Sequence, residues 1–491
     1  MSIRMTGMNS GLDTDSMVQD LVKAYSEKTN TYKKEQTKLE WKQDAWKTLN
    51  TKIYSFYSST LSNMRFSSSY NQKATTVSDP SKATVVAGDS AVNGIQTLSI
   101  SNTAKAAYLT GAELDSSVKA NTKLSSLGIS EGTITVGKGE TGTYGTINIT
   151  ANTTIDEFTA KLSSRGLSAN FDEKNHRMYI SASKTGEASD FSFSGNEDAI
   201  AKLGLSGEGS VKIAGENAKI TLNGVDYESD NNTFTVNGLT VTAKATTAEG
   251  ESISLVTDTD YDAIYKNIKD LIKGFNSVIN EMDKLYNAAQ AKGYEPLTED
   301  EKGAMTDSQI ETWEKKVKDA LLRKDSTVES VMNSMRMSMI KTYSVNGKDM
   351  ALSAYGINTM SYFNAAEFEK NAYHIDGDPD DANSSANKDK LKSAIATDPE
   401  GVSSFFTQLA NDMYDTLSKK MRSTELSSAF TVYDDKKMKE EYTEYTSKIS
   451  KWEQHVADIE DRYYKQFAAM EKAMASLNSS TSALSGLLGS K

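Results

Sequence analysis

The sequence predicts an α+β protein of several domains, with coiled-coil legs built from both termini, a helical-bundle domain, and a nested β-rich head of two small domains. Three observations support this fold class. Apolar residues recur every seven positions near each end, the middle is rich in Gly, Thr, Ser and Asn with alternating apolar residues, and further amphipathic helices follow it. At 491 residues the chain is also too long for a single core.

The C-terminal region carries a heptad pattern that extends over several heptads. Its first row contains Tyr442, Ile449, Val456, Tyr463, Met470, Leu477 and Leu484, and its second row contains Met438, Tyr445, Trp452 and Ile459. An amphipathic helix usually covers the core of its own domain, but the length, the strict period and the mixed charges here favour packing against another arm or another chain.

The N-terminal region repeats this pattern after candidate helix caps at residues 13–15. The main row contains Val18, Tyr25, Tyr32, Leu39, Trp46 and Ile53, with Leu21, Leu49 and Phe56 on a companion row. The companion row fails in the middle, where its expected positions hold Lys28, Glu35 and Lys42. Because one apolar stripe buries little surface, we expect residues 14–42 to need a partner, and the two terminal seams to meet in one coiled coil.

The segment from about residue 77 to 257 has the composition and the alternating apolar pattern of a β-rich region. Its predicted strands cover residues 85–87, 96–101, 133–136, 146–150, 178–182, 219–222, 233–243 and 251–257, with short helices at 154–164 and 198–203. Helical patterns return from Tyr261, after Thr306, around Val331 and from Asp389 to Arg422.

These patterns divide the chain into nested parts. We predict a terminal leg (1–42 and 436–491), a helical domain (43–76 and 258–435), a β-rich domain (77–130 and 206–257) and an inserted outer β-rich domain (131–205). For the helices between residues 264 and 339, the ordinary interpretation as the core of their own domain is favoured.

Motifs that could carry chemistry are weak. Gly137, Gly139 and Gly142 match G-x-G-x-x-G, but they lie between two strand patterns, which favours a hairpin over a nucleotide site. The alternating Asp376, Asp378 and Asp380 resemble a calcium loop without its glycine and terminal Glu, so a solvated acidic loop over residues 377–387 is favoured. The three histidines, His176, His374 and His455, are predicted to be solvated or incidental. We therefore expect no enzyme activity, no cofactor and no metal.

Composition excludes other classes of protein. The net charge is −12, from 55 Lys and Arg against 67 Asp and Glu, so nucleic acid is not expected as a partner. No run of apolar residues is long enough for a membrane helix, and the N-terminus lacks the apolar region of a secretory signal. The chain has no cysteine, which excludes disulfides and thiolate metal sites.

Taken in order, three blocks of sequence closely resemble the bacterial flagellar hook-associated protein 2 family of filament caps. They are SGLDTDSMVQDLVKAYSEKTNTYKKEQTKLEWKQDAWKTLNTKI near the N-terminus, TLNGVDYESDNNTFTVNGLTVTAKA in the β-rich region, and PLTEDEKGAMTDSQIETWEKKVKDALLRKDSTVESVMNSMR in the helical region. The order of these blocks is what makes the resemblance specific. Residues 131–205 match only loosely.

The resemblance implies a homo-oligomeric ring, usually taken as a pentamer, at the distal tip of the flagellum. There it promotes the folding and insertion of exported flagellin and prevents its leakage. Other implied partners are the hook-filament junction protein and an export chaperone, with export through the flagellar type III apparatus without a cleaved signal peptide. In this interpretation Val18, Leu21, Tyr25, Tyr32 and Leu39 pair with Trp452, Val456, Ile459 and Tyr463 and anchor each leg.

Three alternatives remain open at this point. A surface adhesin could bind host glycan or mucin through the β-rich head, an enzyme such as a glycosidase could be grafted on that head, and a hook-filament junction or flagellin-like axial protein has the same helical ends around β domains.

Overall fold

A computed structural model describes residues 11, 13–361, 363 and 365–488 of the chain. It is 47% helical and 22% strand, which confirms the α+β multidomain class. The chain divides into two compact units, a β-rich unit from Asn71 to Tyr261 and a helical unit made of everything before and after it. The predicted division into four parts is finer than this and stays a prediction.

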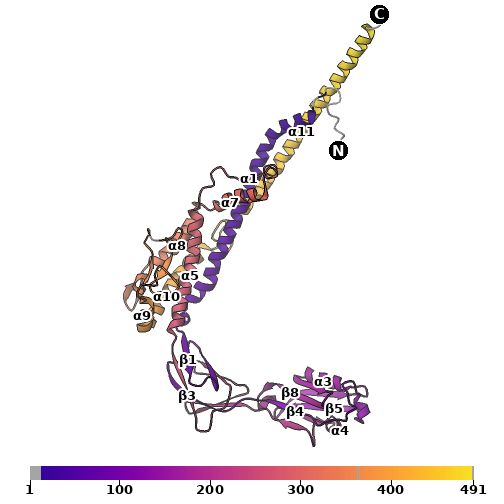
Figure 1. The fold of residues 1–491 in the computed structure, drawn as a ribbon, viewed down its shortest axis with the longest axis vertical. Coiled ribbons are helices and arrows are strands. Elements are labelled where there is room, and N and C mark those ends of the chain that lie inside the picture. The colour runs from indigo at the N-terminus through magenta and orange to yellow at the C-terminus, as the bar shows by residue number, and fades with distance from the viewer. Residues whose placement is uncertain (1–10, 12, 362, 364, 489–491) are drawn as a thin grey trace. The chain divides into compact units, whose positions relative to one another are not determined.

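The helical unit is built from long helices that the apolar periodicity specifies (Figure 1). Its helices are α1 (Thr14–Ser55), a π-helix (Phe56–Leu61), α2 (Ser62–Met64), a 3₁₀ turn (Ser67–Ser69), α5 (Tyr261–Tyr286), α6 (Glu299–Gly303), α7 (Asp307–Asp319), α8 (Ser326–Ile340), a 3₁₀ turn (Leu352–Tyr355), α9 (Lys390–Thr397), α10 (Pro399–Lys420) and α11 (Asp435–Leu488). Its two small hairpins are β16 (Tyr343–Val345) with β17 (Lys348–Met350), and β18 (Ile357–Thr359) with β19 (Tyr373–Ile375).

Local capping chemistry sets the ends of these helices. The Asp13 side chain accepts a hydrogen bond from the backbone N–H of Ser16 and so begins α1 where the sequence predicted. The single helix predicted from 389 to 422 was wrong, because the chain breaks into α9 and α10 at Asp398. Proline disfavours helical geometry in the residue before it, while Pro399 fits the first turn of α10 and Asp398 caps it.

The β-rich unit consists of short antiparallel strands in separate sheets. Its strands are β1 (Lys73–Val77), β2 (Ala83–Ala87), β3 (Gly94–Asn102), β4 (Ala106–Thr110), β5 (Gly132–Lys138), β6 (Gly142–Ile149), β7 (Leu167–Asp172), β8 (Arg177–Thr185), β9 (Phe191–Gly195), β10 (Val211–Ile213), β11 (Ala218–Leu222), β12 (Val225–Ser229), β13 (Thr233–Val236), β14 (Leu239–Ala243) and β15 (Ile253–Thr259). Its helical segments are α3 (Ile155–Ser164), α4 (Glu197–Lys202) and two 3₁₀ turns (Leu124–Leu127 and Glu187–Ser189).

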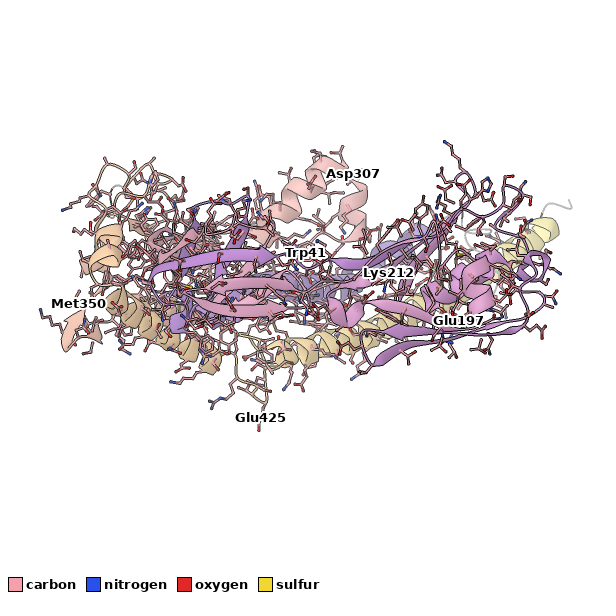
Figure 2. The ribbon with its side chains drawn as sticks, turned by 90° about the horizontal axis from the view of Figure 1, so that it is seen from below. Trp41, Glu197, Lys212, Asp307, Met350 and Glu425 are labelled. Atoms are coloured by element: carbon pink, nitrogen blue, oxygen red, sulfur yellow. The ribbon has the colours of Figure 1, made fainter. Side chains whose placement is uncertain are left out.

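Two separate cores hold the β-rich unit together. One is formed by the sheet β1-β15-β3-β11-β12 with the sheet β13-β14-β2, and its buried side chains come from residues 83–104 and 218–255. The other includes the sheets β10-β4-β8-β7 and β6-β5-β9 with α3 and α4, where Glu197 and Lys212 are labelled in Figure 2. Its buried residues begin at Ala107, so residues 107–129 pack with the predicted outer domain and not with the domain to which the sequence assigned them.

The glycine motif is a hairpin, as predicted. β5 pairs antiparallel with β6, and Gly139 sits between them with a positive φ of 56° that glycine adopts without strain. No helix follows the motif directly, so it has none of the geometry of a nucleotide site.

The acidic loop after β19 is held more tightly than the sequence predicted. Asp378 is buried, and Lys269 on α5 forms ion pairs with both Asp378 and Asp380, the latter at 2.7 Å. His374 Nδ1 lies 2.6 Å from Asp381, so this histidine, which the sequence predicted to be solvated or incidental, is not solvated. Burial alone opposes ionisation, yet the pKa of Asp381 is lowered because His374 and backbone groups hydrogen-bond to it.

Two further findings bear on function. Among the described residues, no helix has both the length and the apolar character that crossing a bilayer requires. Within the same residues, no group of three or more His, Asp and Glu side chains is arranged to hold a metal ion.

The β-rich unit is expected to fold by itself. A fragment from Asn71 to Tyr261 contains both of its cores, so it should show strand-type circular dichroism and cooperative thermal unfolding. Differential scanning calorimetry checks this prediction. A broad, non-cooperative loss of signal would mean that the unit depends on the helices.

Candidate functional site: the paired terminal helices

The helices α1 and α11 lie side by side and run antiparallel (Figure 1). Tyr464 hydrogen-bonds through its hydroxyl to Asp15 at 2.9 Å, and the Gln36 amide donates to the Thr446 hydroxyl at 2.7 Å. Residues later in α1 contact residues earlier in α11, so the two terminal helices form one antiparallel pair. α11 continues beyond the start of α1.

The far end of the pair has its own small apolar core. Val18 and Val22 of α1 pack with Ile459 of α11, and all three are buried. The partly buried side chains packed against this core are Val456, Tyr463, Tyr464 and Phe467. The core contains few residues, so this end of the pair is held by a modest amount of buried apolar surface.

The structure places the predicted seam residues in three groups. Val18, Trp46, Ile449 and Ile459 are buried, and the partly buried residues are Tyr32, Leu39, Tyr442, Tyr445, Trp452, Val456, Tyr463 and Met470. Leu21, Tyr25 and Leu477 are exposed, with Leu21 at 41% and Leu477 at 65% of full exposure. The prediction that these three side chains are buried in the seam was therefore wrong within this chain.

In the N-terminal half of α1 the companion row lies four residues after the main row and not three, whereas Leu49 and Phe56 of the predicted companion row are buried further along. Val22 and Thr29 are buried, and Gln36, which is partly buried, continues their row, whereas Leu21 points to solvent. A spacing of seven allows either offset, and only the direction of the partner decides between them. Leu477 is exposed for another reason, because Tyr464 already lies beside Asp15 at the start of α1.

Polar and aromatic contacts set the register of the pair. The Gln36 amide contacts both the Thr446 hydroxyl and, at 3.4 Å, the Tyr442 carbonyl, while Tyr32 and Tyr445 have ring centroids 6.5 Å apart. Gln466, which continues the second apolar row of α11, is exposed. A hydrogen bond with Tyr25 raises the pKa of Tyr463. The exposed Tyr25 of α1 therefore still contacts α11.

The second half of α1 belongs to the helical unit's core. Trp46 is buried and stacks on Tyr433 with centroids 5.2 Å apart. The Asn50 amide donates to the Phe430 carbonyl at 3.1 Å and accepts from the Val432 N–H at 2.9 Å. These contacts fix the segment that leads into α11, so the same helix supports both the leg and the body.

The segment of chain between α5 and α7 also holds α1 in place through ion pairs. Lys34 is largely buried and forms ion pairs with Glu295 at 2.7 Å and Glu301 at 2.8 Å. Burial by itself lowers the pKa of a lysine, but these two carboxylates raise the pKa of Lys34 overall. The leg therefore begins N-terminal to Lys34, where α1 contacts α11 without this support.

Sequence reasoning missed several residues of the site. Val22, Tyr464 and Phe467 join the far core, and Gln36 and Asn50 supply the polar contacts. A search with both heptad offsets would have found Val22, but the amides carry no periodic signal. The assembled surface offers apolar packing and hydrogen bonds between the two helices.

Comparisons with known proteins agree with this architecture. A family model described as the flagellar hook-associated protein 2 C-terminus matches residues 215–479, and one for the N-terminus matches residues 10–107. The flagellar hook-associated protein 2 of Halalkalibacterium halodurans is 24% identical over 552 residues, covering 98% of this chain and 99% of that protein. That of Escherichia coli K12 is also 24% identical, over 504 residues, covering 98% and 97%.

Among solved structures, the D1-D2-D3 domains of the flagellar cap protein FliD from Escherichia coli match with a TM-score of 0.54 and 19% identity. The match covers 77% of this chain and 96% of that one. It shows that the fold is shared.

Proposed function

Because this chain belongs to the flagellar hook-associated protein 2 family and is a flagellar filament cap, we propose that it works as a homo-oligomeric ring, taken as a pentamer, at the flagellum tip. The observation that carries this proposal is the antiparallel pair of terminal helices, which gives each copy a slender leg that extends from the helical body. In this ring the legs anchor the cap, and flagellin folds and inserts beneath it without leaking away.

The composition of the seam suits a leg that must release and rebind as each flagellin adds. Thr29 and Gln36 occupy its companion row, and the far core has few buried apolar side chains. Polar side chains in a coiled-coil seam lower stability while fixing register. The pairing is therefore specific in alignment and modest in strength.

Flagellin, the hook-filament junction protein and an export chaperone are the proposed partners. Export would pass an unfolded chain through the flagellar type III apparatus, and a chain without cysteine cannot be trapped by disulfides on the way. The family is a structural one, and we propose that this chain is no enzyme.

The adhesin alternative is not favoured. The family models cover the helical regions and the first β core, whereas residues 108–214, which include most of the second core, lie between the two matched ranges. The matched families and the similar proteins are flagellar hook-associated proteins, which favours capping over adhesion.

Labelling and native mass spectrometry test this proposal. Gold-labelled antibody against the chain should mark filament tips only, and the purified chain should give one oligomer of defined mass. Label along the whole filament would favour an axial subunit, and a chain that stays monomeric at all concentrations would exclude the ring.

A further inference from the structure

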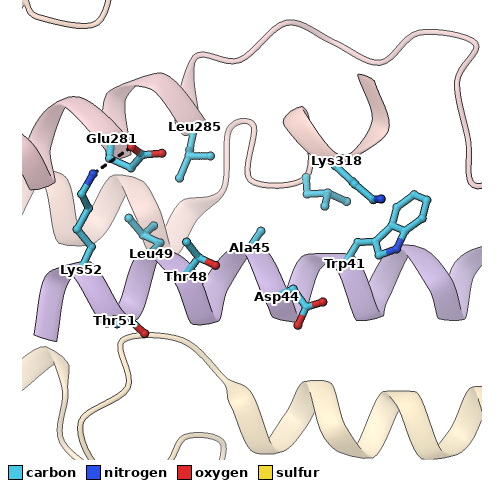
Figure 3. A pocket seen from close by; sticks show the side chains of 11 residues that line it. Trp41, Asp44, Ala45, Thr48, Leu49, Thr51, Lys52, Glu281, Leu285 and Lys318 are labelled. Atoms are coloured by element: carbon cyan, nitrogen blue, oxygen red, sulfur yellow. Dashed lines mark hydrogen bonds and ion pairs between the residues drawn. The ribbon is translucent and has the colours of Figure 1, made fainter. Parts of the chain in front are cut away.

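A groove of about 660 Å³ runs along the second half of α1 in the helical unit (Figure 3). Ala45, Thr48 and Leu49 form its floor, and Leu285 of α5 and Leu321 after α7 form its walls. Ala45 and Thr48 have small side chains, which fill little of the space between α1 and its neighbours. The groove is therefore an apolar surface on an otherwise charged helix.

The charged groups around the groove differ in whether they are paired. Lys52 forms an ion pair with Glu281 at 3.2 Å at one end, as Figure 3 shows. At the other end Lys318 lies 4.3 Å from the centre of the Trp41 ring and pairs with Glu314. Both lysines are thus neutralised by neighbours, and the exposed Asp44 at the rim gives the groove a negative edge.

An exposed apolar pair elsewhere on the same unit has complementary properties. Met337 and Ile340 of α8 are each 62% exposed, and their spacing of three residues puts them on one face of the helix. The opposite face of α8 is buried by Val331, Met335 and Met339. The exposed Arg336 stands beside the pair and gives it a positive edge.

We propose that the groove on α1 receives the Met337 and Ile340 face of α8 from a second copy of this chain. A helix that inserts apolar side chains one turn apart into an apolar groove is a common mode of protein recognition. Arg336 of one copy then faces Asp44 of the next, so the charged edges match as well. The inference rests on the proposed ring and adds which surfaces build it.

The geometry of this contact leads to a ring. The groove and the apolar pair share no residue, so the interface is heterologous: each copy offers the groove to one neighbour and the α8 face to the other. A repeated heterologous contact closes into a ring when its rotation allows, whereas an interface that uses the same patch twice stops at a dimer.

Engineered cysteines test the contact directly, because the natural chain contains none. The double variant Ala45→Cys with Met337→Cys should give ladders of linked chains with a short bis-maleimide. Each single variant should give no linked dimer, since every interface would then contain only one cysteine. The pairing of Ala45→Cys with Ile95→Cys is the matched control, because Ile95 is an exposed apolar residue of the β-rich unit.

Charge reversal gives a second, independent measurement on the full chain. Asp44→Arg alone and Arg336→Asp alone should each weaken assembly at least tenfold by sedimentation, and the two together should restore most of it. An oligomeric wild type whose assembly ignores these changes, or single-cysteine variants that link to themselves, would overturn the contact while leaving the ring intact. A wild type that never assembles would overturn both.

Discussion

Replacing Val18 and Ile459 by Asp is expected to separate the terminal helices and abolish capping. Both side chains are buried in the far core of the pair, where an aspartate would lose its hydration without gaining a partner. The expected loss is on the order of 3 kcal/mol or more, because each aspartate would be a buried charge without a partner. Cells with the double variant should release monomeric flagellin into the medium and fail to swim.

The control for this variant replaces Lys448 and Lys451, both exposed on α11, by Asp. Surface charges contribute little, so swimming should persist. The body of the protein should keep its thermal transition in both cases, because the contacts of Trp46 and Asn50 are untouched. Normal filaments in the Val18 and Ile459 variant would exclude the leg as the anchor.

Replacing Lys269 by Met is expected to destabilise the helical unit by about 3 kcal/mol. Lys269 and Asp378 are both almost fully buried, so removing the lysine leaves a buried carboxylate without its cation. Chemical denaturation at pH 7 measures the loss. Lys266→Met, which removes an exposed pair with Asp270, should change stability by less than about 1 kcal/mol.

The pH dependence gives a second check on the same variant. Lys269 lowers the pKa of Asp380, so this carboxylate is more acidic in the folded protein than in the unfolded chain. Its contribution is present above the unfolded value of about 3.9 and disappears as the pH falls through the folded value. The difference in free energy of unfolding between the wild type and Lys269→Met should therefore become smaller below about pH 4. An advantage that grows in acid would contradict this assignment.

Periodicity alone indicated most of the long helices and the pairing of the two terminal ones. The apolar rows around Val18 and Ile449 predicted that both ends of the chain are assembly helices, because a spacing of seven positions keeps one stripe facing a partner. The alternating middle predicted a β-rich region, and the hairpin at Gly139 followed from glycines between two strand patterns. These are local signals, and each depends only on residues close together in the chain.

Tertiary structure decided which side chains are buried where the local sequence pattern allows more than one arrangement. The position of α11 beside α1 decides that Val22 and Gln36 face it and that Leu21 does not. The sequence of α1 alone does not show on which side the partner helix lies. Lys269 reaches Asp378 across 109 residues, so an acidic loop that looks solvated in sequence becomes a buried ion pair. The groove over Ala45 exists only because α5 and α7 pack beside α1. The local sequence determines which face of each helix or strand is apolar, whereas contacts between distant segments determine which of those faces are buried.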